Sequence, residues 1–163
     1  MKGFTLVEIM IVVAIIALLA AIAIPNLFRA RISAQESVAA GALRTIVAAE
    51  IQYRANNFQF ATLTELGSTT PPYIDLTLAC ANPPCIKQDY KFKVGIPSGG
   101  VQPQFLAVAE PVNLSAAHTY FMTDEGILCR SDSLGITIDP GEVPFAFPLQ
   151  FSGCSIEGFS EAR

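Results

Sequence analysis

An uninterrupted apolar run near the start of the chain dominates its hydrophobic pattern. Ile9 to Ile24 are 16 consecutive apolar residues, and the 21 residues from Phe4 to Ile24 include one charge, Glu8. As a helix, 21 residues span roughly 32 Å, close to the apolar core of a bilayer at about 30 Å. A secretory signal peptide has a shorter apolar region that ends at a small-residue cleavage site. The pattern therefore predicts a membrane-spanning helix that is retained in the protein.

The apolar run continues into an amphipathic pattern over residues 26–56. Between Asn26 and Ala55 there is no proline, and Gly41 is the only glycine. The pattern predicts one helix of roughly 50 residues, about 75 Å long, that stops near Asn56-Asn57 and packs its second half on a sheet. Pro25 lies inside this helix and lacks an N–H, so we expect a weak point there, mainly in an assembled state. The apolar positions at nearly helical spacing are Phe28, Ile32, Ala39, Leu43, Ile46 and Tyr53.

The rest of the chain has the pattern of short strands and turns. Residues Thr62 to Gly67 predict a short helical turn, and the Asp124-Glu125-Gly126 run predicts a hairpin. We expect an α+β fold in which the long helix packs against an antiparallel sheet of three or four strands. The region from Arg130 to Arg163 is expected to be mostly loop, with an alternating pattern at 145–151 that fits an edge strand. The expected strands are Tyr90–Ile96, Phe105–Ala109, Thr119–Thr123 and Ile127–Cys129.

Composition narrows the classes of function. Charged residues make up 15% of the chain and the net charge is −4, so there is no broad basic face, and nucleic acid is not indicated as a partner. His118 is the only histidine, and neither a nucleophile elbow nor a glycine-rich phosphate loop is present, so an enzyme is not predicted. A cluster of acidic residues offers oxygen ligands for calcium, but its spacing matches no EF-hand, so we favour a solvated loop and predict no cofactor. These residues are Asp124, Glu125, Asp132, Asp139 and Glu142.

Four cysteines, Cys80, Cys85, Cys129 and Cys154, all lie beyond the apolar run. They form no Cys-x-x-Cys pair, and an even number outside a membrane indicates disulfides in an oxidising compartment. The basic residues that flank the apolar run do not settle its orientation, but the cysteines favour a C-terminal domain on the outside.

Glu8 leaves two interpretations open. It can reach the membrane interface and complement the positive end of the helix dipole, or it can require a positive partner. If the chain began at Phe4, the new amine would lie four residues away or could come from a neighbouring subunit.

The first 31 residues resemble the class III signal of type IV pilins and type II secretion pseudopilins. The segment Lys2-Gly3-Phe4-Thr5-Leu6-Val7-Glu8 and the apolar run up to Pro25 carry the resemblance. It implies cleavage between Gly3 and Phe4 by a prepilin peptidase, N-methylation of Phe4, and pairing of Glu8 with the Phe4 amine of an adjacent subunit. The implied parts are a leader (1–3), a transmembrane and assembly segment (4–25), an amphipathic continuation (26–56) and a head (57–163).

The resemblance also carries expectations for the head and for location. We favour Cys80 with Cys85, which closes a small loop, and Cys129 with Cys154, which clamps the C-terminal tail as in many pilins. The implied precursor lies in a bacterial inner membrane and then joins identical subunits in an extracellular filament, through the pilus assembly machinery. A type II secretion pseudopilin is the close alternative, and a membrane-anchored binding module that never polymerises is a further one.

Overall fold

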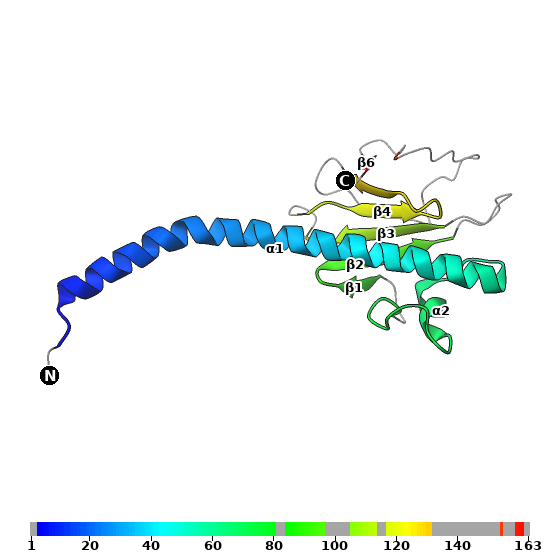
Figure 1. Cartoon of the computed structure of the whole chain (residues 1–163), viewed down its shortest axis with the longest axis horizontal. Helices are drawn as coiled ribbons and strands as arrows, with labels where there is room; N and C mark the ends of the chain where they lie inside the picture. Colours follow the sequence, from blue (N-terminus) through cyan, green and yellow to red (C-terminus); the bar gives the residue numbers. More distant parts are fainter. Residues whose placement is uncertain are drawn as a thin grey trace. The chain divides into compact units, whose positions relative to one another are not determined.

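The structure is a computed structural model, and it describes residues 3–80, 84–96, 105–113, 117–131, 154 and 159–161. By its internal contacts the chain divides into two units, Met1–Ala34 and Gln35–Arg163, and each is described by itself. One long helix, α1 (Leu6–Asn57), contributes to both units, as Figure 1 shows.

The first unit contains the apolar part of α1. Its large apolar side chains are exposed all the way from Leu6 to Phe28; Leu6 near its start is 75% exposed and Phe28 near its end is 61% exposed. Phe28 was expected on the packed face of the helix, and that expectation is wrong because no side chain of this unit covers it. The helix continues through Pro25, so the loss of one backbone hydrogen bond does not end it.

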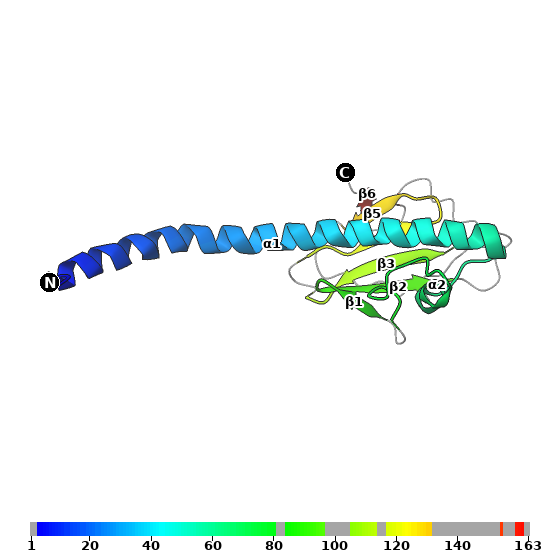
Figure 2. The ribbon, with the colours of Figure 1, turned by 60° about the horizontal axis from the view of Figure 1, so that its bottom comes forward.

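In the second unit, α1 buries one side, and Figures 1 and 2 both show this part running along one face of the sheet. The helix ends at Asn57, as expected, because Phe58 adopts a positive φ of 59°. The amide Nδ2 of Asn57 donates to the Tyr53 carbonyl oxygen at 3.0 Å, which helps to satisfy the last turn. The buried residues of α1 follow helical spacing and are Ala39, Ala42, Leu43, Ile46, Val47, Ala49 and Glu50.

The sheet is antiparallel throughout, and its six strands among the described residues follow one another in chain order. The predicted helix-on-sheet class is confirmed, with more strands than the three or four expected. Two edge strands of three residues each account for the difference, because a segment so short shows no readable alternation. The strands are β1 (Cys85–Lys87), β2 (Tyr90–Gly95), β3 (Leu106–Pro111), β4 (Tyr120–Thr123), β5 (Leu128–Ser131) and β6 (Phe159–Glu161).

Two tight turns set the register of the sheet. The predicted hairpin between β4 and β5 is present, with Gly126 at a φ of 79° and its N–H donating to the Thr123 carbonyl. Between β1 and β2, Gln88 and Asp89 both have positive φ, which fits the right-handed twist of a hairpin. Sequence reasoning missed this second hairpin because its usual signal is Asn-Gly or Asp-Gly.

Both faces of the central strand β3 are covered. On the face toward α1 lie Tyr90 and Tyr120, whose pKa values are raised by burial and then by the nearby Glu36 of the helix. The other face carries a cluster of Leu106, Val108, Phe121 and Cys129, against which Cys154 packs. The expected edge strand at 145–151 lies outside the described residues.

The short helix α2 (Leu63–Ser68) forms where the sequence predicts it. The Thr62 side chain caps the N-terminus, and Glu65 accepts from the Thr62 backbone N–H at 2.7 Å. This hydrogen bonding lowers the pKa of Glu65. Gly67 lies inside the helix. A Cβ at this position would collide with the Cβ of Ala79, so glycine permits a close approach of the following loop.

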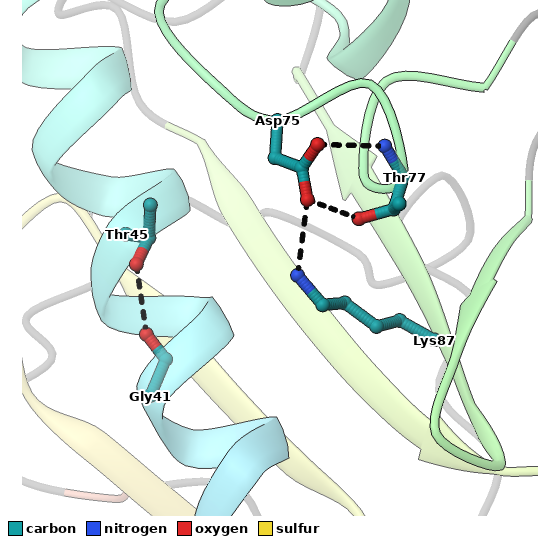
Figure 3. A network of polar contacts seen from close by, with 5 residues as sticks. All are labelled: Gly41, Thr45, Asp75, Thr77 and Lys87. Carbon is teal, nitrogen blue, oxygen red and sulfur yellow. Dashed lines mark hydrogen bonds and ion pairs between the residues drawn. The ribbon is translucent and has the colours of Figure 1, made fainter.

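The loop after α2 is tied to β1 by one carboxylate. Asp75 accepts from the backbone N–H of Thr77 at 3.4 Å and from its hydroxyl at 2.6 Å, as Figure 3 shows. Lys87 of β1 lies 3.4 Å from the same carboxylate. These contacts lower the pKa of Asp75, with the Thr77 hydroxyl as the largest cause.

Candidate functional site

The Gly3–Phe4 junction precedes the first turn of α1 and is not helical. Phe4 is 83% exposed, and no heavy atom lies within 4 Å of where a Cβ on Gly3 would sit. A peptidase must bind its substrate backbone in an extended form, which a helix cannot offer. The predicted cleavage bond therefore lies in an open, non-helical segment of the described chain.

Glu8 is joined to Thr5 in a capping box at the start of α1. The Thr5 hydroxyl accepts from the Glu8 backbone N–H at 3.3 Å, and the Glu8 carboxylate accepts from the Thr5 N–H at 3.0 Å. The Thr5 hydroxyl also donates to Oε2 of Glu8 at 2.9 Å. Glu8 therefore satisfies two polar groups at the helix start, where a negative charge also complements the helix dipole.

Thr5 was missed as a functional residue by sequence reasoning, although a signal was present. Thr5-Leu6-Val7-Glu8 has the Ser/Thr-x-x-Glu spacing of a capping box directly before an apolar run. The predicted cleavage and methylation residues, Gly3 and Phe4, lie just before the helix. Of the two predicted assembly residues, Glu8 lies in its first turn and Pro25 lies further along it.

The apolar part of α1 is long and apolar enough to cross a membrane. Its most apolar window of 18 residues has a mean hydropathy of 3.0, and none of that window is buried inside the protein. A continuous apolar helix surface of this kind, left uncovered, is unfavourable in water. It therefore needs either lipid or other helices around it.

The structure joins the cysteines as Cys80–Cys85 and Cys129–Cys154, the two pairs favoured from the sequence. The first pair links the end of the loop after α2 to the start of β1. The second attaches Cys154 to β5, on the face of the sheet that points away from α1. Both pairs lie in the second unit.

Glu50 is a buried carboxylate that sequence reasoning did not single out. It lies on the buried side of α1 with 0% exposure, and its Oε2 accepts from the Ala61 backbone N–H at 3.0 Å. Its Oε1 has no hydrogen-bond partner among the described residues. Burial, which outweighs the hydrogen bond, raises the pKa of Glu50 to about 7.

His118 lies in the loop before β4, where it is half-buried and hydrogen-bonded. Its backbone N–H donates to Glu36 of α1 at 3.1 Å, and its Nδ1 lies 2.9 Å from the Ser131 carbonyl oxygen of β5. The Tyr90 hydroxyl donates to the His118 carbonyl at 2.9 Å. His118 thus connects the helix with β2 and β5, which is a structural role.

The cluster of acidic residues, for which a solvated loop was favoured over a calcium site, falls only partly within the described residues. Asp124 is half-buried, and burial raises its pKa, whereas Glu125 is exposed. Asp132, Asp139 and Glu142 lie outside the described residues. Within the part that the structure describes, no three histidine, cysteine or carboxylate side chains come close enough to hold a metal ion.

The N-terminal segment of the chain also matches a known sequence family. Residues 1–24 match the prokaryotic N-terminal methylation motif. This match confirms the resemblance seen in the sequence, and it covers the predicted cleavage junction, the capping box and the whole apolar run.

Two curated proteins are similar to larger parts of the chain. The major component of the type IV wide pilus of Thermus thermophilus is 40% identical over 86 residues, 50% of this chain and 66% of that protein. Core protein G of the type II secretion system of Pseudomonas aeruginosa is 41% identical over 59 residues, 36% of this chain and 42% of that protein. The chain thus spans just under two thirds of the first relative and less than half of the second. No solved structure matches the chain.

Proposed function

Because the chain carries the N-terminal methylation motif of type IV pilins and type II secretion pseudopilins, we propose that it is a structural subunit of a type IV pilus-like extracellular filament. The observation that carries the proposal is the exposed apolar part of α1, which begins with a single carboxylate. Such a surface can exchange lipid for the same surface of a neighbouring subunit at little cost, because both environments are apolar.

The geometry of Glu8 supports its role in selecting the neighbour. Both donor groups of Thr5 contact the same oxygen, Oε2, so the carboxylate can cap its own helix while Oε1 accepts a further donor. After cleavage before Phe4, the new N-methylated amine of an adjacent subunit is that donor. A charge in an apolar bundle without a partner costs about 2.5–3.5 kcal/mol on insertion scales, so the pair favours one register between subunits.

The proposal assigns each part of the chain a place in the pathway. Residues 4–25 hold the precursor in a bacterial inner membrane, prepilin peptidase removes residues 1–3, and the pilus assembly machinery adds the subunit to a helical homopolymer. Residues 57–163 form the head outside the membrane, which fits the two disulfides. The protein acts as a structural component and not as an enzyme.

A pair of substitutions at Glu8 tests the proposal. Glu8→Gln retains a side chain that can complete the capping box but removes the charge, whereas Glu8→Ala removes both. We expect both variants to insert and to be cleaved, and both to lose at least about tenfold in sheared filaments, because charge pairing drives assembly. Glu125→Gln, at an exposed turn of the head, is the matched control and assembles normally.

The outcomes separate the two roles of Glu8. Normal filaments from Glu8→Gln and none from Glu8→Ala would mean that capping alone matters and that the ion pair is wrong. Normal filaments from Glu8→Ala would overturn assembly through this residue.

A pseudopilin of a type II secretion system is the second candidate. The observation that favours it is the 41% identity over 59 residues to core protein G of such a system. The features of α1 described above serve either filament equally, so the choice depends on what the cell loses without this chain.

A further inference from the structure

A polar pocket lies in the second unit, between the last turns of α1 and the loop that follows α2. Its volume is about 570 Å³, which falls in the range of small-molecule sites. We name it the Tyr53–Tyr73 pocket. Its lining residues are Gln52, Tyr53, Asn56, Asn57, Thr69, Thr70, Pro71, Pro72 and Tyr73.

Contacts between the two walls hold the pocket in shape. The rings of Tyr53 and Tyr73 meet edge to face with their centres 5.7 Å apart. The amide Nδ2 of Asn56 donates to the Tyr73 hydroxyl at 3.0 Å. Because the helix wall and the loop wall are bonded to each other, little ordering remains to be done when a ligand enters.

The loop wall is also anchored to α2. The Tyr73 backbone N–H donates to the Leu66 carbonyl at 2.9 Å, and the Thr69 hydroxyl lies 3.3 Å from the same oxygen. The Thr69 hydroxyl also lies 3.0 Å from the Pro71 carbonyl. The loop that carries about half of the lining is thus held in place by hydrogen bonds to α2.

The lining has a distinctive chemistry, because none of its nine residues carries a formal charge. A phosphate, a carboxylate or an amine would find no counter-charge in this lining, so an ionic ligand has no advantage here over a neutral one. Seven of the nine side chains carry an amide or a hydroxyl group, and the amides of Gln52, Asn56 and Asn57 combine donors with an acceptor. The remaining surface consists of tyrosine rings and prolines, which are flat and apolar.

A ligand that fits this lining needs many neutral hydroxyl groups and an apolar face. A sugar ring has both, since its hydroxyls pair with amide and hydroxyl side chains while its C–H face packs on an aromatic ring. We propose that the Tyr53–Tyr73 pocket binds a neutral saccharide of one or two rings. This binding activity goes beyond filament formation and does not depend on it.

Ligand-observed NMR on the full chain in detergent micelles tests the proposal. The probes are N-acetylglucosamine, lactose, maltose and cellobiose, with glucuronic acid as a charged probe and a proline-rich peptide as a different class of ligand. We expect saturation transfer to the ring C–H protons of at least one neutral sugar, with a dissociation constant of roughly 1 mM. Glucuronic acid is expected to give a weaker signal.

Variants locate the signal. Tyr73→Ala is expected to weaken sugar binding at least about tenfold, whereas Tyr73→Phe retains the ring and weakens it less. Because Tyr73→Ala can disturb the loop, the exposed residues Gln52 and Thr70 give a second pair, Gln52→Ala and Thr70→Ala, each expected to weaken binding several-fold. Gln59→Ala is the matched control, because Gln59 is an exposed amide that does not line the pocket.

Three results would overturn the proposal. They are the absence of a signal from every neutral sugar, a signal that all pocket variants retain, and preferential binding of the proline-rich peptide, which would make the pocket a peptide site. Loss of filaments in a separate assay leaves this measurement unaffected, so the two proposals fail independently.

Discussion

Two glutamates in α1 show how differently a carboxylate can be accommodated. Glu8 obtains its partners from Thr5, the residue just before the first residue of the helix. Glu50 obtains its one observed partner, the Ala61 N–H, from the segment that follows the helix, and the rest of the carboxylate is buried. The first arrangement remains when the helix is alone, whereas the second exists only when the head is folded.

The pKa of Glu50 predicts a pH dependence of stability. An ordinary glutamate has a pKa of 4.5, and burial raises that of Glu50 to about 7 in the folded state. Between these values the folded chain binds more protons than the unfolded chain, so the free energy of unfolding falls as pH rises from 4.5 to 7. The decline amounts to at most about 3 kcal/mol and then levels off.

Urea unfolding of the full chain in micelles from pH 4.5 to 8 measures this effect. Glu50→Gln is expected to flatten the decline, with its largest gain over the wild type at pH 8. Glu65 and Asp75 act in the opposite sense, because their lowered pKa values make stability fall as pH drops from their ordinary pKa values toward the lower values of the folded state. Parallel curves for Glu50→Gln and the control Glu125→Gln would show that Glu50 does not titrate as described.

At the scale of elements, two helical glycines occupy opposite environments. Gly41 is exposed in α1, and nothing lies within 4 Å of where its Cβ would sit, although its carbonyl accepts from the Thr45 hydroxyl at 3.1 Å (Figure 3). Gly67 in α2 has Ala79 in that place. The effect of a side chain at position 41 on stability therefore depends on helix propensity alone, whereas at position 67 it depends on packing against Ala79.

Alanine at each glycine is expected to have opposite effects. Gly41→Ala should raise the free energy of unfolding by about 0.5–1 kcal/mol, because alanine favours the helix by that amount. Gly67→Ala should lower it by about 1–3 kcal/mol, because the loop must move to admit a methyl group. Thermal or urea unfolding of both variants checks this, and equal signs would contradict the contrast.

The Cys129–Cys154 disulfide is the second element-scale prediction. Its cysteines are 25 residues apart, and closing such a loop contributes about 3 kcal/mol by the chain-entropy model, against about 2 kcal/mol for Cys80–Cys85 at a separation of 5. Replacing Cys129 and Cys154 by alanine should therefore lower the free energy of unfolding of the head more than replacing Cys80 and Cys85. Peptide mapping without reduction checks the pairing itself, and a Cys80–Cys129 peptide would refute it.

At the scale of the whole molecule, the two units face different demands. The first unit has no core of its own and presents apolar side chains outward, whereas the second buries aromatic residues on both faces of β3. A surface that only lipid or other helices can cover requires either a membrane or an assembly around this unit.

Deletion of the gene distinguishes the two candidate filaments. For a pilus subunit, electron microscopy should show that surface filaments disappear, while folded proteins are still exported at wild-type levels. Restoring the gene should restore the filaments. Retained filaments together with folded substrates trapped inside the envelope would instead identify a secretion pseudopilus.

The sequence was most informative where interactions are local. The bilayer-length run, the short helix at Thr62 to Gly67, the end of α1 and the Gly126 hairpin were all predicted, because each depends on residues within one or two turns. The Thr5–Glu8 box was readable in the same way. The Gln88-Asp89 hairpin was not, because neither residue is the glycine that usually marks such a turn.

Only the tertiary structure decided the features that depend on distant segments. The edge strands β1 and β6 are too short to show a pattern and exist because a neighbouring strand pairs with them. The burial of Glu50, the two covered faces of β3 and the Tyr53–Tyr73 pocket likewise arise where segments far apart in the chain meet. By itself, therefore, the sequence determined the anchor and its assembly signal, since lipid and the first helical turn act on neighbouring residues. The tertiary structure decided the surfaces of the head, since long-range packing sets which side chains share a site.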